Sequence, residues 1–169
     1  MSGTDFFKVS GTQRQDQVVK LSNNSYLLIF GYGKENEDDE QGYNWRKYYD
    51  HQPSELELKE DITALIDKCT DERILTGFQW NGSNVYLSQE NQMNFKAAYD
   101  LAVQTQGATL PIKFKLGEDA DCNPIYHTFA ELAEFTDFYT KAVTFIVTAL
   151  NEGWEEKDSI DYPNLIADE

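Results

Sequence analysis

Two apolar segments near the start of the chain have the composition of β-strands. Residues 17–21 alternate weakly between apolar and polar positions, and residues 26–32 are a run of aliphatic and aromatic side chains. The Ser-Asn-Asn-Ser sequence between them has the chemistry of a turn. Together these features predict an N-terminal β-hairpin, which must pack on something or pair with a partner because two strands alone are marginally stable in water. Residues 1–15 carry few apolar side chains, which predicts a loosely held arm.

Apolar residues with a period of 3.6 predict the first helix. The stripe consists of Leu58, Ile62, Leu65, Ile66 and Cys69. Ser54 and Glu57 have the spacing of a capping box, in which each side chain satisfies a backbone amide of the other residue. We therefore expect a helix that begins after Ser54 and ends near residue 68, with Cys69 as a small core residue.

The pattern then changes to two strands around a tight turn. One face of the first strand is predicted to hold Ile74, Thr76, Phe78 and Trp80. Asn81-Gly82 is a strong hairpin signal because both central positions of the preferred turn need a positive φ, and residues 85–87 form the expected return strand. Ser88 is the expected N-cap of a second helix, which Gly107 ends.

A second strand, turn, strand and helix follow. Residues 110–116 alternate, with Lys113 and Lys115 on the polar face, and residues 124–127 are the expected return strand. Thr128 begins another capping-box sequence. The helix that it predicts, about residues 129–151, has the widest apolar face, so we expect it to be central and to end at Gly153.

These elements predict an α+β fold. A small N-terminal β-hairpin region precedes a domain of two β-hairpins and three helices, of which the last is central. The predicted organisation is residues 1–50 as arm, hairpin and aromatic linker, residues 51–155 as the α+β domain, and residues 156–169 as an acidic tail.

The charge of the chain narrows the choice of partners. Its net charge is −16 and its pI is near 4.4. Binding to nucleic-acid phosphates requires clustered Lys and Arg, so this charge disfavours nucleic acid, and it equally disfavours anionic membrane surfaces. A strongly acidic surface keeps copies of a protein apart in solution, but it is also what a mimic of nucleic-acid charge needs.

The sequence contains little that indicates catalysis. Cys122 and His127 are close in sequence to Asp119 and Asp121, but structural zinc sites require four ligands at tight spacing. No local motif supports a Cys–His nucleophilic pair. We therefore expect no enzymatic activity, no cofactor and no metal, and a small hydrolase that uses Cys122 and His127 stays as a third hypothesis.

An aromatic segment provides the candidate binding site. It contains residue types that dominate protein–protein hot spots, namely Tyr43, Trp45, Arg46, Tyr48 and Tyr49. The alternative interpretation is that these rings cover the N-terminal hairpin as a small core, because aromatic side chains are usually buried for their area.

Two segments resemble a known family. They are Glu72-Arg-Ile-Leu-Thr-Gly-Phe-Gln-Trp-Asn-Gly82 and Val85-Tyr-Leu-Ser-Gln-Glu-Asn-Gln92. With the long later helix, they resemble an uncharacterised domain of bacteriophage tail-fibre and tail-fibre-assembly proteins, in the versions carried by phages or prophages of Bacteroides-like gut bacteria. The resemblance covers roughly residues 55–155. It implies a virion component or an assembly chaperone of the tail, and it implies no catalytic residues.

We therefore expect a non-enzymatic, phage tail-associated protein that binds another protein, a tail or fibre protein, with no nucleic acid and no membrane as partners. Self-association into a homo-oligomer is a further option. The alternative function is an acidic, phage-encoded inhibitor of a host enzyme that mimics the charge of nucleic acid. The start of the sequence lacks the pattern of a secretory signal, so the expected location is the virion or the cytoplasm of the bacterial host.

Overall fold

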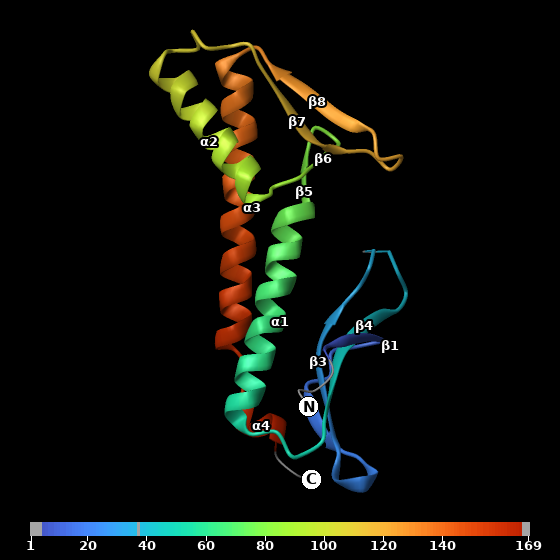
Figure 1. Cartoon of the computed structure of the whole chain (residues 1–169). Helices are drawn as coiled ribbons and strands as arrows, with labels where there is room; N and C mark the ends of the chain where they lie inside the picture. Colours follow the sequence, from blue (N-terminus) through green and yellow to red (C-terminus); the bar gives the residue numbers. More distant parts are fainter. Residues whose placement is uncertain (1–4, 37, 167–169) are drawn as a thin grey trace. The chain divides into compact units, whose positions relative to one another are not determined.

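The structure is a computed structural model that describes residues 5–36 and 38–166. The beginning of the predicted arm, the end of the predicted acidic tail and Glu37 lie outside the described residues. Within the described part of the chain, eight strands in antiparallel sheets and four α-helices make up the fold (Figure 1). The α+β class predicted from the sequence is confirmed.

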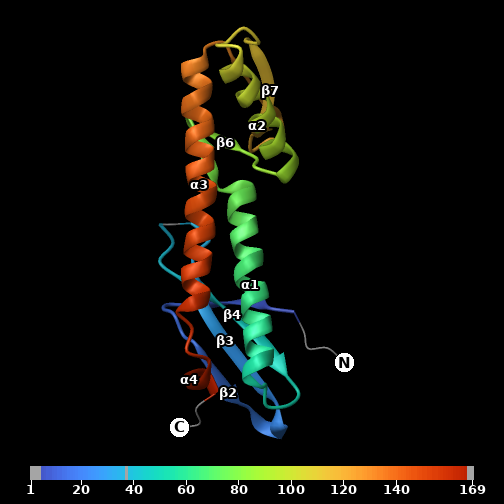
Figure 2. The ribbon, with the colours of Figure 1, turned by 90° about the vertical axis from the view of Figure 1, so that its left-hand side faces the viewer.

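An antiparallel sheet of four strands, in the order β1-β4-β3-β2, forms the N-terminal part of the chain (Figure 2). The strands are β1 (Phe7–Gly11), β2 (Gln17–Lys20), β3 (Tyr26–Gly33) and β4 (Gly42–Tyr49), and a 3₁₀ turn, Ser22–Asn24, joins β2 to β3. The predicted hairpin is confirmed, because β2 pairs with β3. In place of a loose arm and a linker, β1 and β4 extend that hairpin, which gives it the strands that a stable sheet needs.

Helices cover one face of this sheet. Helix α1 (Glu55–Thr76) buries Leu58 and Ile62, and the short α4 (Tyr162–Ile166) lies against β2 with Tyr162 and Leu165 buried. These apolar side chains and the inward side chains of β3 are removed from water together, and each large side chain stabilises the fold by roughly 1.5–3 kcal/mol relative to an exposed position.

The first turn of α1 has the predicted cap. The Ser54 amide donates to Glu57 Oε2 at 2.9 Å, and the Glu57 amide donates to Ser54 Oγ at 3.3 Å. The capping box is therefore confirmed.

The observed end of α1 differs from the predicted end near residue 68. The helix continues through Thr76, so the predicted strand face that included Ile74 and Thr76 is wrong. The Thr76 hydroxyl donates to the carbonyl oxygen of Glu72 at 3.0 Å, and the helix stops at Gly77, whose amide donates to the carbonyl oxygen of Arg73 at 2.8 Å. A short alternating pattern fits the last turn of an amphipathic helix as well as a strand, which explains the error.

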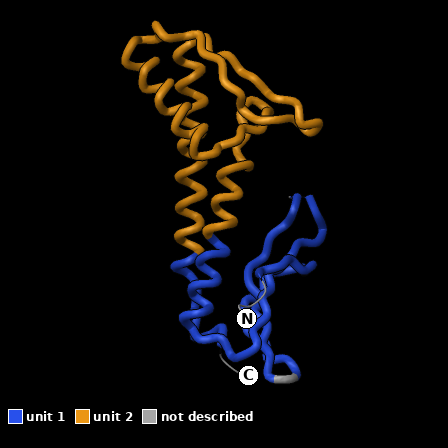
Figure 3. The backbone as a smooth tube through the Cα atoms, viewed as in Figure 1, with its two compact units in different colours: residues 1–66, 157–169 blue, residues 67–156 orange. Residues whose placement is uncertain are grey.

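The backbone divides into two units (Figure 3). The first consists of residues 1–66 and 157–169, and the second of residues 67–156. Helix α1 and the last long helix, α3 (Leu132–Asp158), each contribute residues to both units. None of the described helices combines the length and the apolar character needed to cross a membrane.

The second unit contains both predicted hairpins, but the return strand of the first ends at Val85, so its predicted position at residues 85–87 is wrong. Strand β5 (Phe78–Trp80) pairs with β6 (Ser83–Val85), and β7 (Ile112–Glu118) pairs with β8 (Pro124–Phe129). The first turn is confirmed as well, because Asn81 and Gly82 have φ angles of 49° and 78°.

Helix α2 (Gln89–Gln104) begins as predicted, with Ser88 Oγ accepting the Asn91 amide at 3.2 Å. The start predicted for α3 is wrong: Thr128 lies in β8, and the helix begins at Leu132. Its predicted end is also wrong, because α3 continues past Gly153. Its inward face supplies the central side chains of the core of this unit: Phe135, Phe138, Ala142 and Ala149.

Candidate functional site

Strand alternation divides the five predicted site residues between the two faces of β4. Tyr43, Trp45 and Tyr49 project to the face that packs on α1, while Arg46 and Tyr48 project to the opposite face. The structure therefore does not gather the five side chains on one surface.

Tyr49 has a structural role. It is 7% exposed, and its hydroxyl donates to Asp61 Oδ2 of α1 at 2.6 Å. Lys47 Nζ lies 2.6 Å from Asp61 Oδ1. Burial, together with the bond to this carboxylate, raises the pKa of Tyr49 strongly. The three side chains thus fix the first part of α1 on the sheet.

Tyr43 and Trp45 lie edge to face, with ring centres 5.6 Å apart. Lys8 Nζ lies 4.1 Å from the centre of the Tyr43 ring and 5.3 Å from that of Trp45, and it forms an ion pair of 2.6 Å with Glu35. The hydrogen bond to Glu35 raises the pKa of Lys8. Such a cation over a ring contributes about 0.5–1 kcal/mol at an exposed site, so this pair of rings already has a partner within the chain.

Tyr48 is the accessible ring on the other face. It is 46% exposed and stacks on Phe7 of β1, with ring centres 5.5 Å apart. Arg46 Nε is buried, and no atom of the described residues accepts a hydrogen bond from it. A binding role for these residues stays a prediction, and Tyr48 is the one best placed to test it.

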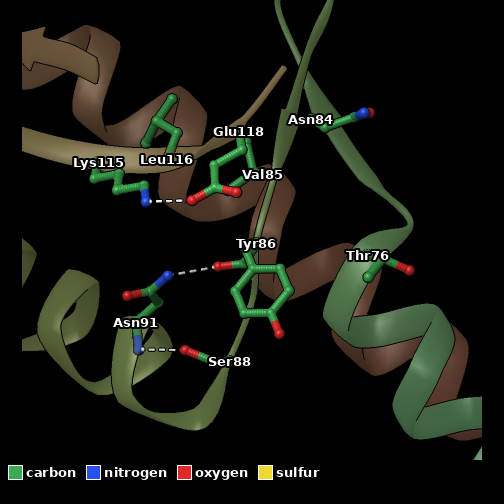
Figure 4. Close-up of a pocket in the computed structure, with 10 residues that line it drawn as sticks. Thr76, Asn84, Val85, Tyr86, Ser88, Asn91, Lys115, Leu116 and Glu118 are labelled. Atoms are coloured by element: carbon green, nitrogen blue, oxygen red, sulfur yellow. Dashed lines mark hydrogen bonds and ion pairs between the residues drawn. The ribbon is translucent and has the colours of Figure 1, made fainter. Parts of the chain in front are cut away.

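The structure adds a cleft that was not predicted from the sequence. It lies in the second unit between residues 84–91 and strand β7, and it has a volume of about 630 Å³ (Figure 4). This volume lies within the range of small-molecule ligand pockets, about 300–1,000 Å³.

A bulge in β7 builds this cleft. The register of β7 on β8 shifts between Lys115 and Gly117, and the Leu116 carbonyl oxygen accepts a hydrogen bond from the Tyr86 amide at 2.7 Å. At Gly117 a Cβ atom would lie 2.8 Å from the carbonyl oxygen of Asn84. Glycine at this position therefore lets the two backbones approach each other.

Tyr86 is one of the residues that line the cleft, and in the close-up its ring lies between Asn91 and Ser88 on one side and Thr76 on the other (Figure 4). It is 46% exposed. Asn91 Nδ2 donates a hydrogen bond to the Tyr86 carbonyl oxygen at 2.8 Å, and the Tyr86 amide donates to the carbonyl oxygen of Leu116. The backbone of Tyr86 is therefore fixed on both sides. Within the described part of the chain, the Tyr86 hydroxyl makes no hydrogen bond, which leaves it available to a ligand.

Charged groups border the cleft on β7. Lys115 Nζ lies 2.6 Å from Glu118 Oε1, and this hydrogen bond raises the pKa of Lys115. On the same face of the hairpin, Lys113 Nζ lies 4.4 Å from the ring centre of Tyr126, which is 54% exposed. Lys113, Lys115 and Tyr126 thus share one face of the hairpin, and of these three it is Lys115 that lines the cleft with Tyr86.

Cys122 and His127 lie in different surroundings. Cys122 is exposed in the β7–β8 turn, where its φ is 61°. The His127 ring packs against Trp80 and Phe129, with ring centres 4.9 and 4.6 Å away, and its Nε2 lies 3.0 Å from Glu134 Oε1. These contacts give His127 a structural role.

The residues near Cys122 shape the turn. Asp119 Oδ1 accepts the amides of Asp121 and Asn123, at 2.9 and 2.8 Å. Among the residues that the structure describes, no three His, Cys, Asp or Glu side chains gather in a group that could hold a metal ion.

One signal for the cleft is present in the sequence. Val85 and Leu87 are buried, so a period of two turns Tyr86 outward. The bulge that brings β7 to Tyr86 has no such signal. Comparisons of the chain with protein-family models, with curated proteins and with solved structures find no match.

Proposed function

We propose that this chain is a non-enzymatic, phage tail-associated protein that acts by binding another protein, as a virion component or as an assembly chaperone. One observation carries this proposal: the segment with the family resemblance supplies a wall of the cleft. Residues 72–92 contribute Thr76, Asn84, Val85, Tyr86, Ser88 and Asn91 to its lining.

The chemistry of the cleft suits a protein partner. Half-exposed tyrosines offer a large ring and a hydroxyl at a small entropic cost, and they are enriched among binding hot spots. Lys115 adds an ammonium group to the cleft, and Lys113 lies on the same face of the hairpin; such groups complement carboxylates or carbonyl oxygens on a partner and favour its correct orientation. The ring of Tyr86, held by fixed backbone on both sides, is the expected anchor.

The test is co-expression of the full chain with the products of the neighbouring genes, a fibre protein among them, followed by measurement of the affinity of any complex. We expect Tyr86→Ala to weaken binding by at least tenfold, about 1.4 kcal/mol. Tyr48→Ala is the matched control, because Tyr48 has the same 46% exposure but lies on β4.

Two outcomes would contradict the assignment of binding to the cleft, and the second would contradict the proposed function as well. A complex that depends on Tyr48 and not on Tyr86 would place binding on the β4 aromatic segment. A complex with a host nucleic-acid enzyme that dissociates steeply with added salt and ignores Tyr86→Ala would support charge mimicry, since screening acts on exposed charges.

A further inference from the structure

The loop between β4 and α1 holds a histidine between two carboxylates. His51 Nδ1 lies 2.8 Å from Oδ1 of Asp50, which belongs to the same loop, and His51 Nε2 lies 2.9 Å from Oε1 of Glu57, in the first turn of α1. The Tyr49 ring of β4 meets the imidazole edge to face, with ring centres 6.3 Å apart. His51 therefore connects the loop to the helix that follows it.

The two distances specify the protonation of the His51 ring. A neutral imidazole has one nitrogen that donates a hydrogen bond and one that accepts, whereas an ionised carboxylate oxygen only accepts. Both ring nitrogens lie within hydrogen-bond distance of carboxylate oxygens, so both bonds form only when the ring carries two protons and a positive charge. After the loss of one proton, a nitrogen lone pair would face a carboxylate oxygen at 2.8 or 2.9 Å and repel it.

Glu57 transmits this change to the cap of α1. Its Oε1 atom contacts His51, while its Oε2 atom accepts hydrogen bonds from the Ser54 amide and the Ser54 hydroxyl, at 2.9 and 2.7 Å. One carboxylate thus bridges the imidazole and the residue that caps the helix. Any displacement of Glu57 from His51 therefore also disturbs the capping box, which satisfies backbone amides at the start of α1.

The other charged and titratable groups at this corner are bound elsewhere or keep one charge state. Lys47 and the Tyr49 hydroxyl both contact Asp61, each at 2.6 Å. Burial and the bond to Asp61 raise the pKa of Tyr49 strongly, so this ring stays neutral while His51 titrates. The hydrogen bond from His51 lowers the pKa of Asp50, which therefore stays charged.

We propose that His51 is a proton-dependent clasp between the β4–α1 loop and the first turn of α1, closed when the imidazole carries both protons and open when it loses one. The clasp belongs to the first unit and the cleft to the second, so it does not depend on the function proposed for the cleft.

The pH range of the clasp follows from the charges of its members. The hydrogen bonds to Asp50 and to Glu57 raise the pKa of His51 above its ordinary value of 6.5. Because the folded state favours the charged ring, the clasp contributes fully below pH 6.5, and its contribution is lost as the pH rises through the raised pKa. At the acid end, protonation of Glu57 opens it as the pH falls from 4.5 towards 2.

The first experiment follows the His51 ring of the full chain by NMR as the pH changes. The chain has two histidines, and the signals lost in His51→Gln identify those of His51. We expect a titration midpoint above pH 6.5. Asp50→Asn should lower it, because this variant removes one of the two acceptors. Asp71→Asn is the matched control, since Asp71 is exposed in the last part of α1, far from the loop in sequence, and it should leave the midpoint unchanged.

The second experiment measures whether the cap follows the ring. The Leu58 amide donates to the Ser54 carbonyl oxygen at 3.0 Å, and the Gln92 amide of α2 donates to the Ser88 carbonyl oxygen at 2.9 Å. Protection is the exchange rate of each amide relative to its intrinsic rate at the same pH. We expect the protection of Leu58 to fall about two- to fivefold as the pH rises through the His51 midpoint, the range for an exposed ion pair, and that of Gln92 to stay unchanged.

His51→Gln should abolish the fall at Leu58, because an amide side chain does not titrate. A His51 midpoint at or below pH 6.5 would overturn the proposal, and so would equal midpoint shifts in Asp50→Asn and Asp71→Asn. A constant protection of Leu58 across the midpoint, or a fall that persists in His51→Gln or is shared by Gln92, would overturn it as well.

Discussion

Gly153 of α3 lies directly against Thr70 of α1. A Cβ atom at Gly153 would lie 2.6 Å from Thr70 Oγ1, and Gly153 is buried in the interior of a helix that continues to Asp158. Glycine in a helix interior costs about 1 kcal/mol relative to alanine. Its presence here is explained by the close approach of two helices.

Gly153→Ala is therefore expected to destabilise the chain, although alanine favours helix. The added methyl group must displace Thr70 or separate the helices, and overpacking of this kind costs about 1–3 kcal/mol. Urea unfolding followed by circular dichroism measures the change.

The control is the double variant Gly153→Ala with Thr70→Ala. Removing the Thr70 hydroxyl creates the space that the new methyl group needs, so most of the lost stability should return. If the double variant were as unstable as the sum of the two single variants, the contact would not be the cause.

Features that depend on a few neighbouring residues were predictable. The Asn81–Gly82 turn and the caps at Ser54 and Ser88 are determined within four residues of sequence. Gly153 was not predictable in this way, because a glycine signals a helix end and a close helix contact equally well. What distinguishes the two cases at Gly153 is the contact with Thr70, a residue that is far from Gly153 in the sequence.

Gly117→Ala tests how the cleft is built. A Cβ atom at this position would lie 2.8 Å from the carbonyl oxygen of Asn84, a backbone atom that cannot rotate away. We expect a loss of about 1–3 kcal/mol of unfolding free energy and faster hydrogen exchange of the Tyr86 amide, which bonds to Leu116.

Gly82→Ala is the comparison for this variant. Its added methyl group would meet nothing within 4 Å, so its cost comes only from a φ of 78°. It should therefore leave the exchange of the Tyr86 amide unchanged. Equal exchange in both variants would disprove the proposed role of Gly117.

The candidate sites also depend on contacts between residues that are far apart in the sequence. Residues 43–49 are rich in hot-spot types, yet their positions on β4 assign Tyr49 to the core and Tyr48 to the surface. Tyr86 and Lys115 each face outward by their period of two, but their meeting depends on one bulge in β7. The register of the strands decides which side chains meet across them, and a single sequence does not specify that register.

Acid should weaken the start of α1. Hydrogen bonds from the Ser54 amide, the Ser54 hydroxyl and His51 lower the pKa of Glu57 from 4.5 to about 2. Because the folded state favours the charged carboxylate, its contribution to stability is complete above pH 4.5 and is lost as the pH falls towards 2. Glu57→Gln should lower stability at neutral pH. Between pH 4.5 and 2, its urea midpoint should fall less steeply than that of the wild type.

Glu60→Gln is the control for this change. Glu60 is exposed on the same helix and takes no part in the capping box. The variant should keep the full acid dependence of the wild type. If Glu57→Gln declined as steeply as Glu60→Gln between pH 4.5 and 2, the cap would not be responsible for the acid sensitivity.

Tyr49→Phe separates the structural role of the aromatic segment from a binding role. The substitution removes the donor to Asp61 but keeps the ring, so Asp61 retains Lys47 as its partner. We expect a loss of about 1–2 kcal/mol of unfolding free energy, the value of a hydrogen bond to a charged group that stays partly solvated. Tyr48→Phe, at an exposed ring, should change stability by less than about 0.5 kcal/mol. The opposite order of the two effects would mean that Tyr49 does not fix α1 on the sheet, and it would return Tyr49 to the candidate binding surface.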